Sequence, residues 1–289
     1  MADANAVSPS IPVALTIAGS DSGGGAGIQA DLRTFSFHLV HGTSALTCVT
    51  AQNTVGVTRV DALPAEAVIA QIEAVAGDIG VQAAKTGMLL NQEIIEAVAG
   101  YLSANPIERL VVDPVMVSRT GDVLIAEGAI ASLRQQLLPL ADVLTPNRYE
   151  AQMLADMDIA TLEDMRTAAK KICDLGPKAV IVKGGGFKGE LRGVDVWFDG
   201  EQMEVLSTEQ VDTTNTHGTG CTLSSAIAAN LAKGVPAYES VKNAKRYVTQ
   251  ALKHSLSIGK GQGPVGHFYS LLDSSLLDSS LRSQTDSQS

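Results

Sequence analysis

Three glycine-rich segments of the chain carry the residue types that bind phosphate groups. The first, residues 18–31, reads Ala-Gly-Ser-Asp-Ser-Gly-Gly-Gly-Ala-Gly-Ile-Gln-Ala-Asp and lies between a predicted strand and a predicted helix. Its five glycines would let the backbone approach a ligand closely, although a plain flexible turn would also use glycine. The helix that follows carries Asp31 one turn in. We interpret the segment as a ligand-binding loop.

The second segment, Lys183-Gly-Gly-Gly-Phe-Lys-Gly189, matches the pattern Gly-x-Gly-x-x-Gly. A dinucleotide site needs a helix after this pattern, whereas Val194–Phe198 alternates like a strand and ends in a turn signal. We therefore exclude a dinucleotide-binding fold here. Lys183 at a strand end beside glycines suits a phosphate as a point charge, with an ordinary solvated lysine as the alternative.

The third segment, residues 214–223, reads Thr-Asn-Thr-His-Gly-Thr-Gly-Cys-Thr-Leu and leads directly into a predicted helix. The first amides of a helix are free donors at the positive end of its dipole, so Gly218, Thr219 and Gly220 predict an anion hole. Cys221 would lie in the first turn, where the dipole lowers the pKa of a thiol. The alternative is a small buried cysteine at a helix start.

Carboxylates follow two further predicted strands. Asp113 comes directly after Leu110–Val112, and Glu150 ends the run Thr-Pro-Asn-Arg-Tyr-Glu that follows residues 142–144. Mg²⁺ is usually held by one or two carboxylates together with water and substrate phosphates. Asp113 and Glu150 are therefore candidate Mg²⁺ ligands, although each taken alone would also serve as a cap or turn residue.

The elements that must position these loops alternate between strand and helix. Short apolar runs predict strands at residues 13–18, 43–50, 82–86, 109–112, 142–144, 179–183, 194–198 and 203–206, with an extended excursion at 55–63. Helical patterns cover residues 28–39, where Leu32, Phe35 and Leu39 share a face, and later residues 220–233 and 237–257. Nearly apolar strands between helices indicate an α/β fold of three layers, α/β/α, with a central, mostly parallel sheet. Ligands of such sheets collect beyond the C-terminal strand ends, where the unusual residues fall.

Composition narrows the function classes. The 289 residues carry a net charge of −10 and only 4% aromatic side chains, which argues against a nucleic-acid binder. No apolar run approaches the roughly 18 residues of a membrane helix, so no membrane association is expected. Three widely spaced cysteines favour a reduced, cytoplasmic protein without structural disulfides.

No internal linker divides the chain. We predict a disordered tail at residues 1–11, one domain at 12–270 and a mobile, Ser-rich tail at 271–289. A short helix on the leucines of the repeated Leu-Leu-Asp-Ser-Ser is the alternative for the start of that last segment.

Taken together, these segments resemble the hydroxymethylpyrimidine/phosphomethylpyrimidine kinase family of the ribokinase-like superfamily. The resemblance covers residues 12–268 and rests on the three glycine segments and on Gln52-Asn-Thr, Lys85-Thr-Gly-Met, Asp113-Pro-Val-Met-Val, Thr145-Pro-Asn and Gly-Lys-Gly-x-Gly-Pro-Val-x-His-Phe at 259–268. It implies a ribokinase-like domain with a small β-hairpin excursion, and a homodimer. One departure is Ser118-Arg-Thr-Gly, where the family has Ala-Lys-Ser-Gly, so no phosphate contact is transferred to Arg119.

The resemblance also implies chemistry. ATP with Mg²⁺ would phosphorylate hydroxymethylpyrimidine and then its monophosphate. Gln52 would hydrogen-bond the aminopyrimidine, Lys183 and Thr219 would face ATP, and Asp113 and Glu150 would organise Mg²⁺. Cys221 would be the base beside the anion hole. The remaining residues that would line the pyrimidine pocket are Gly19, Asp31, Met88 and Val115.

Two alternatives stay open from the sequence. A pyridoxal kinase of the cysteine-containing type shares the Gly-Thr-Gly-Cys segment, although Gln52 favours the aminopyrimidine because an amide both donates and accepts hydrogen bonds. A non-catalytic vitamin-binding module would keep the fold without the activity.

Overall fold

The computed structural model describes residues 11–117 and 125–272. An eight-stranded sheet forms its centre, in the order β10-β9-β8-β7-β6-β5-β1-β2. Its strands are β1 (Val13–Ala18), β2 (His41–Leu46), β5 (Ala83–Thr86), β6 (Arg109–Val112), β7 (Val143–Leu144), β8 (Val180–Val182), β9 (Asp195–Phe198) and β10 (Met203–Leu206). Strands β8, β7, β6, β5, β1 and β2 run parallel, and β9 and β10 are antiparallel to their neighbours. The predicted mostly parallel sheet is confirmed.

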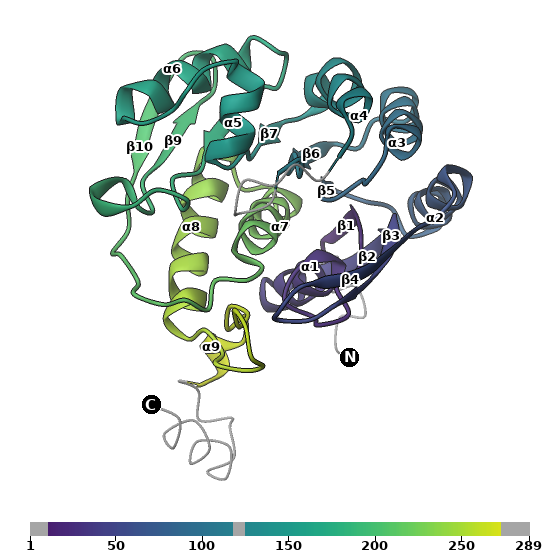
Figure 1. Ribbon diagram of the computed structural model, residues 1–289. Helices are drawn as coiled ribbons and strands as arrows, with labels where there is room; N and C mark the ends of the chain where they lie inside the picture. The colour runs from purple at the N-terminus through teal and green to yellow at the C-terminus, as the bar shows by residue number, and fades with distance from the viewer. Residues whose placement is uncertain (1–10, 118–124, 273–289) are drawn as a thin grey trace, which may run out of the picture.

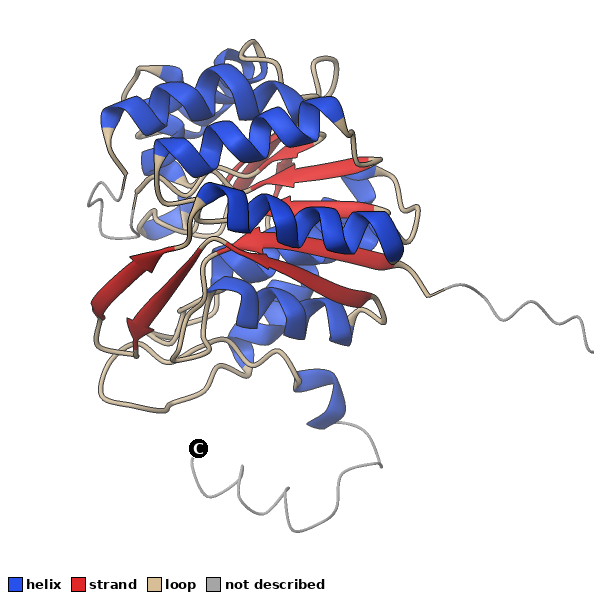
Figure 2. Cartoon of the chain, turned by 90° about the vertical axis from the view of Figure 1, so that its right-hand side faces the viewer, coloured by secondary structure: helices blue, strands red, loops and turns tan. Residues whose placement is uncertain are grey.

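Helices cover both faces of this sheet, as Figure 2 shows. They are α1 (Gly27–Phe37), α2 (Ala65–Asp78), α3 (Gln92–Ala104), α4 (Glu127–Ser132), η1 (Leu133–Leu137), η2 (Leu138–Leu140), α5 (Arg148–Ala155), α6 (Leu162–Cys173), η3 (Gly189–Leu191), α7 (Thr219–Ala232), α8 (Ala237–Lys253) and α9 (Tyr269–Leu272). Successive strand residues point to opposite faces of the sheet, so neighbouring apolar residues of one strand pack into two separate hydrophobic cores.

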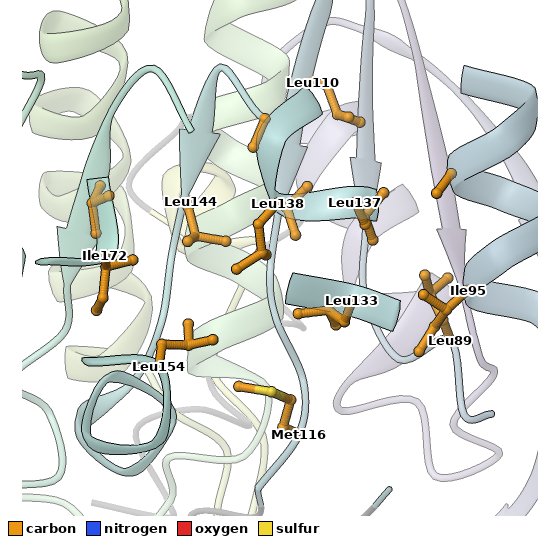
Figure 3. Close-up of a cluster of buried hydrophobic side chains, with 14 of the residues drawn as sticks. Leu89, Ile95, Leu110, Met116, Leu133, Leu137, Leu138, Leu144, Leu154 and Ile172 are labelled. Carbon is orange, nitrogen blue, oxygen red and sulfur yellow. The ribbon is translucent and has the colours of Figure 1, made fainter. Parts of the chain in front are cut away.

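One core lies between the sheet and helices α2 to α6. It takes Leu110 and Val112 from β6, whereas the intervening Val111 packs into the other core with α1, α7 and α8. Figure 3 shows part of the first core, where leucines of η1 lie between the sheet and the surrounding helices. This alternation explains why the strands read as continuous apolar runs in the sequence.

A two-stranded antiparallel sheet of β3 (Cys48–Gln52) and β4 (Val57–Ala62) stands apart from the main sheet. It confirms the β-hairpin excursion and corrects the single strand expected at residues 43–50. The chain turns at Thr47, whose N–H donates to the Ala18 carbonyl at 3.0 Å and whose hydroxyl donates to the Met88 carbonyl at 2.8 Å. The first half of the run therefore stays in the main sheet as β2, and the second half leaves it as β3.

Two further expectations change at element ends. Helix α1 stops at Phe37, and Leu39 lies beyond it with a φ of 57° and 82% exposure, so Leu39 does not share the buried face of Leu32 and Phe35. At the C-terminus, Tyr269–Leu272 form α9 (Figure 1), so helical structure continues two residues past the predicted domain end. The remaining residues of both predicted tails, and Arg119, lie outside the described residues apart from Ile11.

Candidate active site

The three glycine segments meet at the C-terminal edge of the parallel strands. The first follows β1, the second follows β8, and the third begins α7, which packs against β1, β5 and β6. The approach is close: a Cβ on Gly218 would lie 1.8 Å from the carbonyl oxygen of Gly25, and a Cβ on Gly25 would lie 2.2 Å from the His217 ring. Gly218 also has a φ of 81°, in the left-handed region. Glycine is therefore required where the first and third segments touch.

The start of α7 lies at the residues where the sequence predicts an anion hole. Thr219 and Gly220 occupy the first helical turn, where amides lack intrahelical acceptors. Gly220 lies beside a lysine and a carboxylate, since a Cβ there would be 3.5 Å from Lys183 Nζ and 3.8 Å from Asp113 Oδ2. The first turn of α7 and the Lys183 ammonium group thus lie side by side at Gly220, as an anion site requires, and the Thr219 N–H beside them donates to the Thr216 carbonyl at 3.3 Å.

Lys183 and Asp113 form an ion pair at this point. Lys183 Nζ donates to Asp113 Oδ1 at 3.0 Å, and the Thr145 hydroxyl donates to the same oxygen at 3.0 Å. Burial alone would raise the pKa of Asp113, but the charges of Lys183 and Lys85 outweigh it and lower the pKa. Lys183 keeps its proton for the matching reason, because Asp113 and Glu150 raise its pKa against the effect of burial.

Glu150 lies near the Lys183–Asp113 ion pair and also stabilises the start of α5. It completes a capping box at the start of α5, accepting from the Asn147 N–H at 2.7 Å while Asn147 accepts from the Glu150 N–H at 3.0 Å. The predicted alternative of a capping residue is therefore also correct. Burial raises the pKa of Glu150 to about 8, with a smaller contribution from the charge of Asp113.

The side chains near this ion pair suit Mg²⁺, because proteins usually supply only one or two of its ligands and water and phosphate oxygens supply the rest. Within residues 11–117 and 125–272 there is no group of three His, Cys, Asp or Glu side chains that could hold a metal ion. Asp113 supplies a carboxylate beside a phosphate-type site, and Glu150 would supply a second one once the charge of a bound Mg²⁺ displaces its proton, which suits Mg²⁺ bound mainly through water and nucleotide phosphates. A closed metal cage is absent from this part of the chain.

A cleft of about 250 Å³ opens from the anion hole along the second glycine segment. Its lining includes Lys183, Gly185 and Thr219 as well as the apolar side chains of Leu223 from α7 and Val248 from α8. The lining therefore offers polar groups that suit phosphates and apolar groups that suit a flat ring. Lys183 and Thr219, the residues expected to face ATP, both line this cleft.

Cys221 lies on the other side of the α7 start, against the first glycine segment. The Gly27 N–H donates to its sulfur, and the charge of Lys85 also favours the thiolate. Burial nevertheless dominates and raises the pKa of Cys221 from 9.0 to about 11, assisted by the charges of Asp31 and Asp113. The predicted lowering of this pKa is wrong, because loss of water around the sulfur outweighs the helix dipole.

The residues expected to line a pyrimidine pocket divide into two groups. Gly19 and Met88 lie together, since a Cβ on Gly19 would be 3.0 Å from Met88 Cε, and Gln52 is half-buried at the end of β3. Val115 is half-buried two residues after Asp113, and its N–H donates to the Asp113 carbonyl at 2.8 Å.

Asp31 is the exception, because it lies beneath the site with no exposed surface. Its carboxylate accepts from Lys85 Nζ at 2.9 Å, from the Thr16 hydroxyl at 2.6 Å and from the Ser225 hydroxyl at 2.5 Å. With three donors already bound, Asp31 supports the α7 start and does not line the pocket. Lys85, whose pKa is raised mainly by Asp31 against the effect of burial, is likewise fully buried.

Sequence reasoning missed the pair Asp21–His217. His217 Nε2 donates to Asp21 Oδ2 at 2.8 Å and lies 3.4 Å from Gln52 Nε2. Asp21 also accepts from the amides of Gly23, Gly25 and Ala26, so it fixes the first glycine segment and ties it to the third. The only available signal was an aspartate inside a glycine run, which reads equally well as a turn residue.

Comparisons with known proteins agree with this geometry. Residues 21–266 match the family model described as phosphomethylpyrimidine kinase. A hydroxymethylpyrimidine/phosphomethylpyrimidine kinase of Synechococcus elongatus is 63% identical over 261 residues, which cover 90% of this chain and 99% of that protein.

Two solved structures are also similar. A Bacillus subtilis pyridoxal kinase, solved as an ADP complex, has a TM-score of 0.84 and 43% identity over 91% of this chain and all of its own. A phosphomethylpyrimidine kinase of Clostridium difficile has a TM-score of 0.76 and 42% identity, covering 84% of this chain and 100% of its own. On the family model and these identities, the chain belongs to the phosphomethylpyrimidine kinase family.

Proposed function

We propose that the chain transfers the γ-phosphoryl group of ATP to the hydroxymethyl group of 4-amino-5-hydroxymethyl-2-methylpyrimidine, and then a second one to the resulting monophosphate, in thiamine biosynthesis. The observation that carries this proposal is that the α7 start, Lys183 and Asp113 come together beside the cleft, where the α7 start touches the first glycine segment. Phosphoryl transfer needs mainly positioning and charge stabilisation, and this site offers both.

The nucleotide would occupy the cleft, with its phosphates toward the anion hole. The similar pyridoxal kinase of B. subtilis binds ADP, which supports nucleotide binding by this fold. Lys183 and the amides of Thr219 and Gly220 would hold the terminal phosphate. Asp113 and Glu150 would hold Mg²⁺ through water, and the ion would neutralise phosphate charge when bound.

The pyrimidine would lie on the opposite side of the α7 start, near Gly19, Gln52, Met88 and Val115. Cys221 would flank the reacting hydroxyl. Because its thiol has a pKa of about 11, it is neutral at pH 7 in the free protein, so we assign it to shaping the reacting end rather than to a resting thiolate base. The hydroxyl proton can leave late in a loose transition state, which makes a strong base unnecessary.

Product analysis tests the proposed reaction. Mass spectrometry of the protein with the pyrimidine alcohol and MgATP should show the monophosphate first and the diphosphate later. The same assay with pyridoxal covers the second candidate, which the likeness to pyridoxal kinase structures favours. Faster turnover of pyridoxal, without any pyrimidine diphosphate, would contradict the proposal.

We further propose that the protein works as a homodimer in the cytoplasm. Valines of the β3–β4 sheet are exposed, among them Val49 (44%), Val57 (51%) and Val60 (43%), and a second copy of the chain would cover them. All three cysteines are free thiols, which suits a reducing compartment. No helix in the described part of the chain is long and apolar enough to cross a membrane. Sedimentation equilibrium at twice the monomer mass, and cytoplasmic fluorescence of a tagged protein, are the expected results.

A further inference from the structure

Arg148, the first residue of α5, lines the nucleotide cleft and has no ion pair or hydrogen bond to its side chain among the described residues. Its side chain lines the cleft together with Lys183, Gly185 and Gly186. No ion pair or hydrogen bond engages its guanidinium group within the described residues, and its Nε is buried without any acceptor. A buried donor that lacks an acceptor costs about 1–3 kcal/mol, so such groups in a cleft indicate a missing ligand.

The position of this guanidinium group is nevertheless fixed. Its Cζ lies 4.6 Å from the centre of the Phe187 ring, at cation–π distance. Phe187 is 7% exposed and belongs to the core beneath the sheet edge, and its N–H donates to the Gly184 carbonyl at 3.0 Å. The ring therefore anchors the second glycine segment and holds the arginine against it.

The backbone places Arg148 next to the phosphate side of the cleft. Asn147 pairs with Lys183 as an isolated parallel bridge, and the Lys183 N–H donates to the Pro146 carbonyl at 2.9 Å. Arg148 at the start of α5 and Lys183 just after β8 are therefore held close together, and both line one cleft. A planar guanidinium fork matches phosphate oxygens in pairs, whereas Lys183 supplies a point charge.

We infer that Arg148 binds the phosphate chain of the nucleotide, with its guanidinium group stacked on Phe187. The inference rests on the proposed function, since it assigns a second cation to the same nucleotide site. It is specific for phosphate: the side chain should contribute to the binding of ADP and not to that of adenosine.

The test compares ADP with adenosine, both measured by displacement of a fluorescent nucleotide at one salt concentration. Arg148→Met should weaken ADP binding about tenfold or more, because a charge-assisted bond is lost, and leave adenosine binding within about twofold. Arg148→Lys, which keeps the charge and loses the planar fork, should weaken ADP binding less. The matched control is Arg166→Met on α6, an exposed arginine paired with Glu163, which should change neither affinity.

The following outcomes would overturn the inference. Unchanged ADP binding in Arg148→Met means that the arginine does not touch the phosphates. Equal losses for ADP and adenosine mean that it supports the loop or contacts the base. If Arg148→Met does not fold, the same comparison in Arg148→Lys decides. Pyrimidine phosphorylation that persists with an unchanged KM for ATP refutes the inference alone, whereas a wild-type protein that binds no ADP refutes the proposed function as well.

Discussion

Replacing Gly218 by alanine should separate the two glycine segments on which the site depends. The added Cβ would lie 1.8 Å from the Gly25 carbonyl oxygen, whereas ordinary van der Waals contact begins at 3.4 Å. One backbone must therefore move by about 1.6 Å, since no flexible side chain is present to give way. The left-handed φ of 81° adds about 1–2 kcal/mol of strain for alanine.

The expected consequences follow from that displacement. A misplacement of about 1 Å at a reacting centre costs about a hundredfold in rate, so kcat should fall by at least that factor. The free energy of unfolding should fall by at least about 1 kcal/mol. Steady-state kinetics with MgATP and the pyrimidine alcohol measure the first effect, and urea unfolding measures the second.

Gly100→Ala on α3 is the matched control. A Cβ at Gly100 meets nothing within 4 Å, and the residue lies inside a helix. This substitution should raise stability by about 0.5–1 kcal/mol and leave kcat unchanged. Wild-type kcat and stability in Gly218→Ala would refute the close contact between the first and third glycine segments.

Three more predictions concern charge. Alkylation of Cys221 by iodoacetamide at pH 8, followed by peptide mass spectrometry, should be about a hundredfold slower than for a thiol of pKa 9.0, because burial raises its pKa to about 11; a rate equal to that of a free thiol would contradict this. Lys183→Ala should raise the KM for ATP more than that for the pyrimidine, and an unchanged KM for ATP would remove it from the nucleotide site. Burial raises the pKa of Glu150 from 4.5 to about 8, so its stabilising contribution is complete below pH 4.5 and is lost as the pH rises through 8. The Tm advantage of the wild type over Glu150→Gln should therefore shrink between pH 5 and pH 9, and a constant difference would argue against the raised pKa.

Much of the fold could be predicted from local patterns. The capping box of Thr161 and Asp164 and the hairpin turn at Asp199 depend only on neighbouring residues, and both occur in the structure. The end of the run at residues 43–50 could not be predicted, because its break at Thr47 depends on acceptors at Ala18 and Met88, distant in the sequence.

The candidate site likewise has features that the sequence predicts and features that depend on distant contacts. Glycine density and strand ends located the loops around Lys183 and Cys221. The sequence could not reveal that Asp31 turns away from the pocket, because its partner Lys85 lies 54 residues later in the chain. The pKa of Cys221 depends on three-dimensional burial, which a helix-dipole argument does not include.

The most direct test of the central claim is a crystal structure of the protein with ADP and the pyrimidine alcohol. The account predicts the β-phosphate at the amides of Thr219 and Gly220, within hydrogen-bond distance of Lys183, and the pyrimidine hydroxymethyl group on the opposite side of the α7 start, beside Cys221. Phosphates bound away from the first turn of α7, or a pyrimidine remote from Cys221, would contradict it.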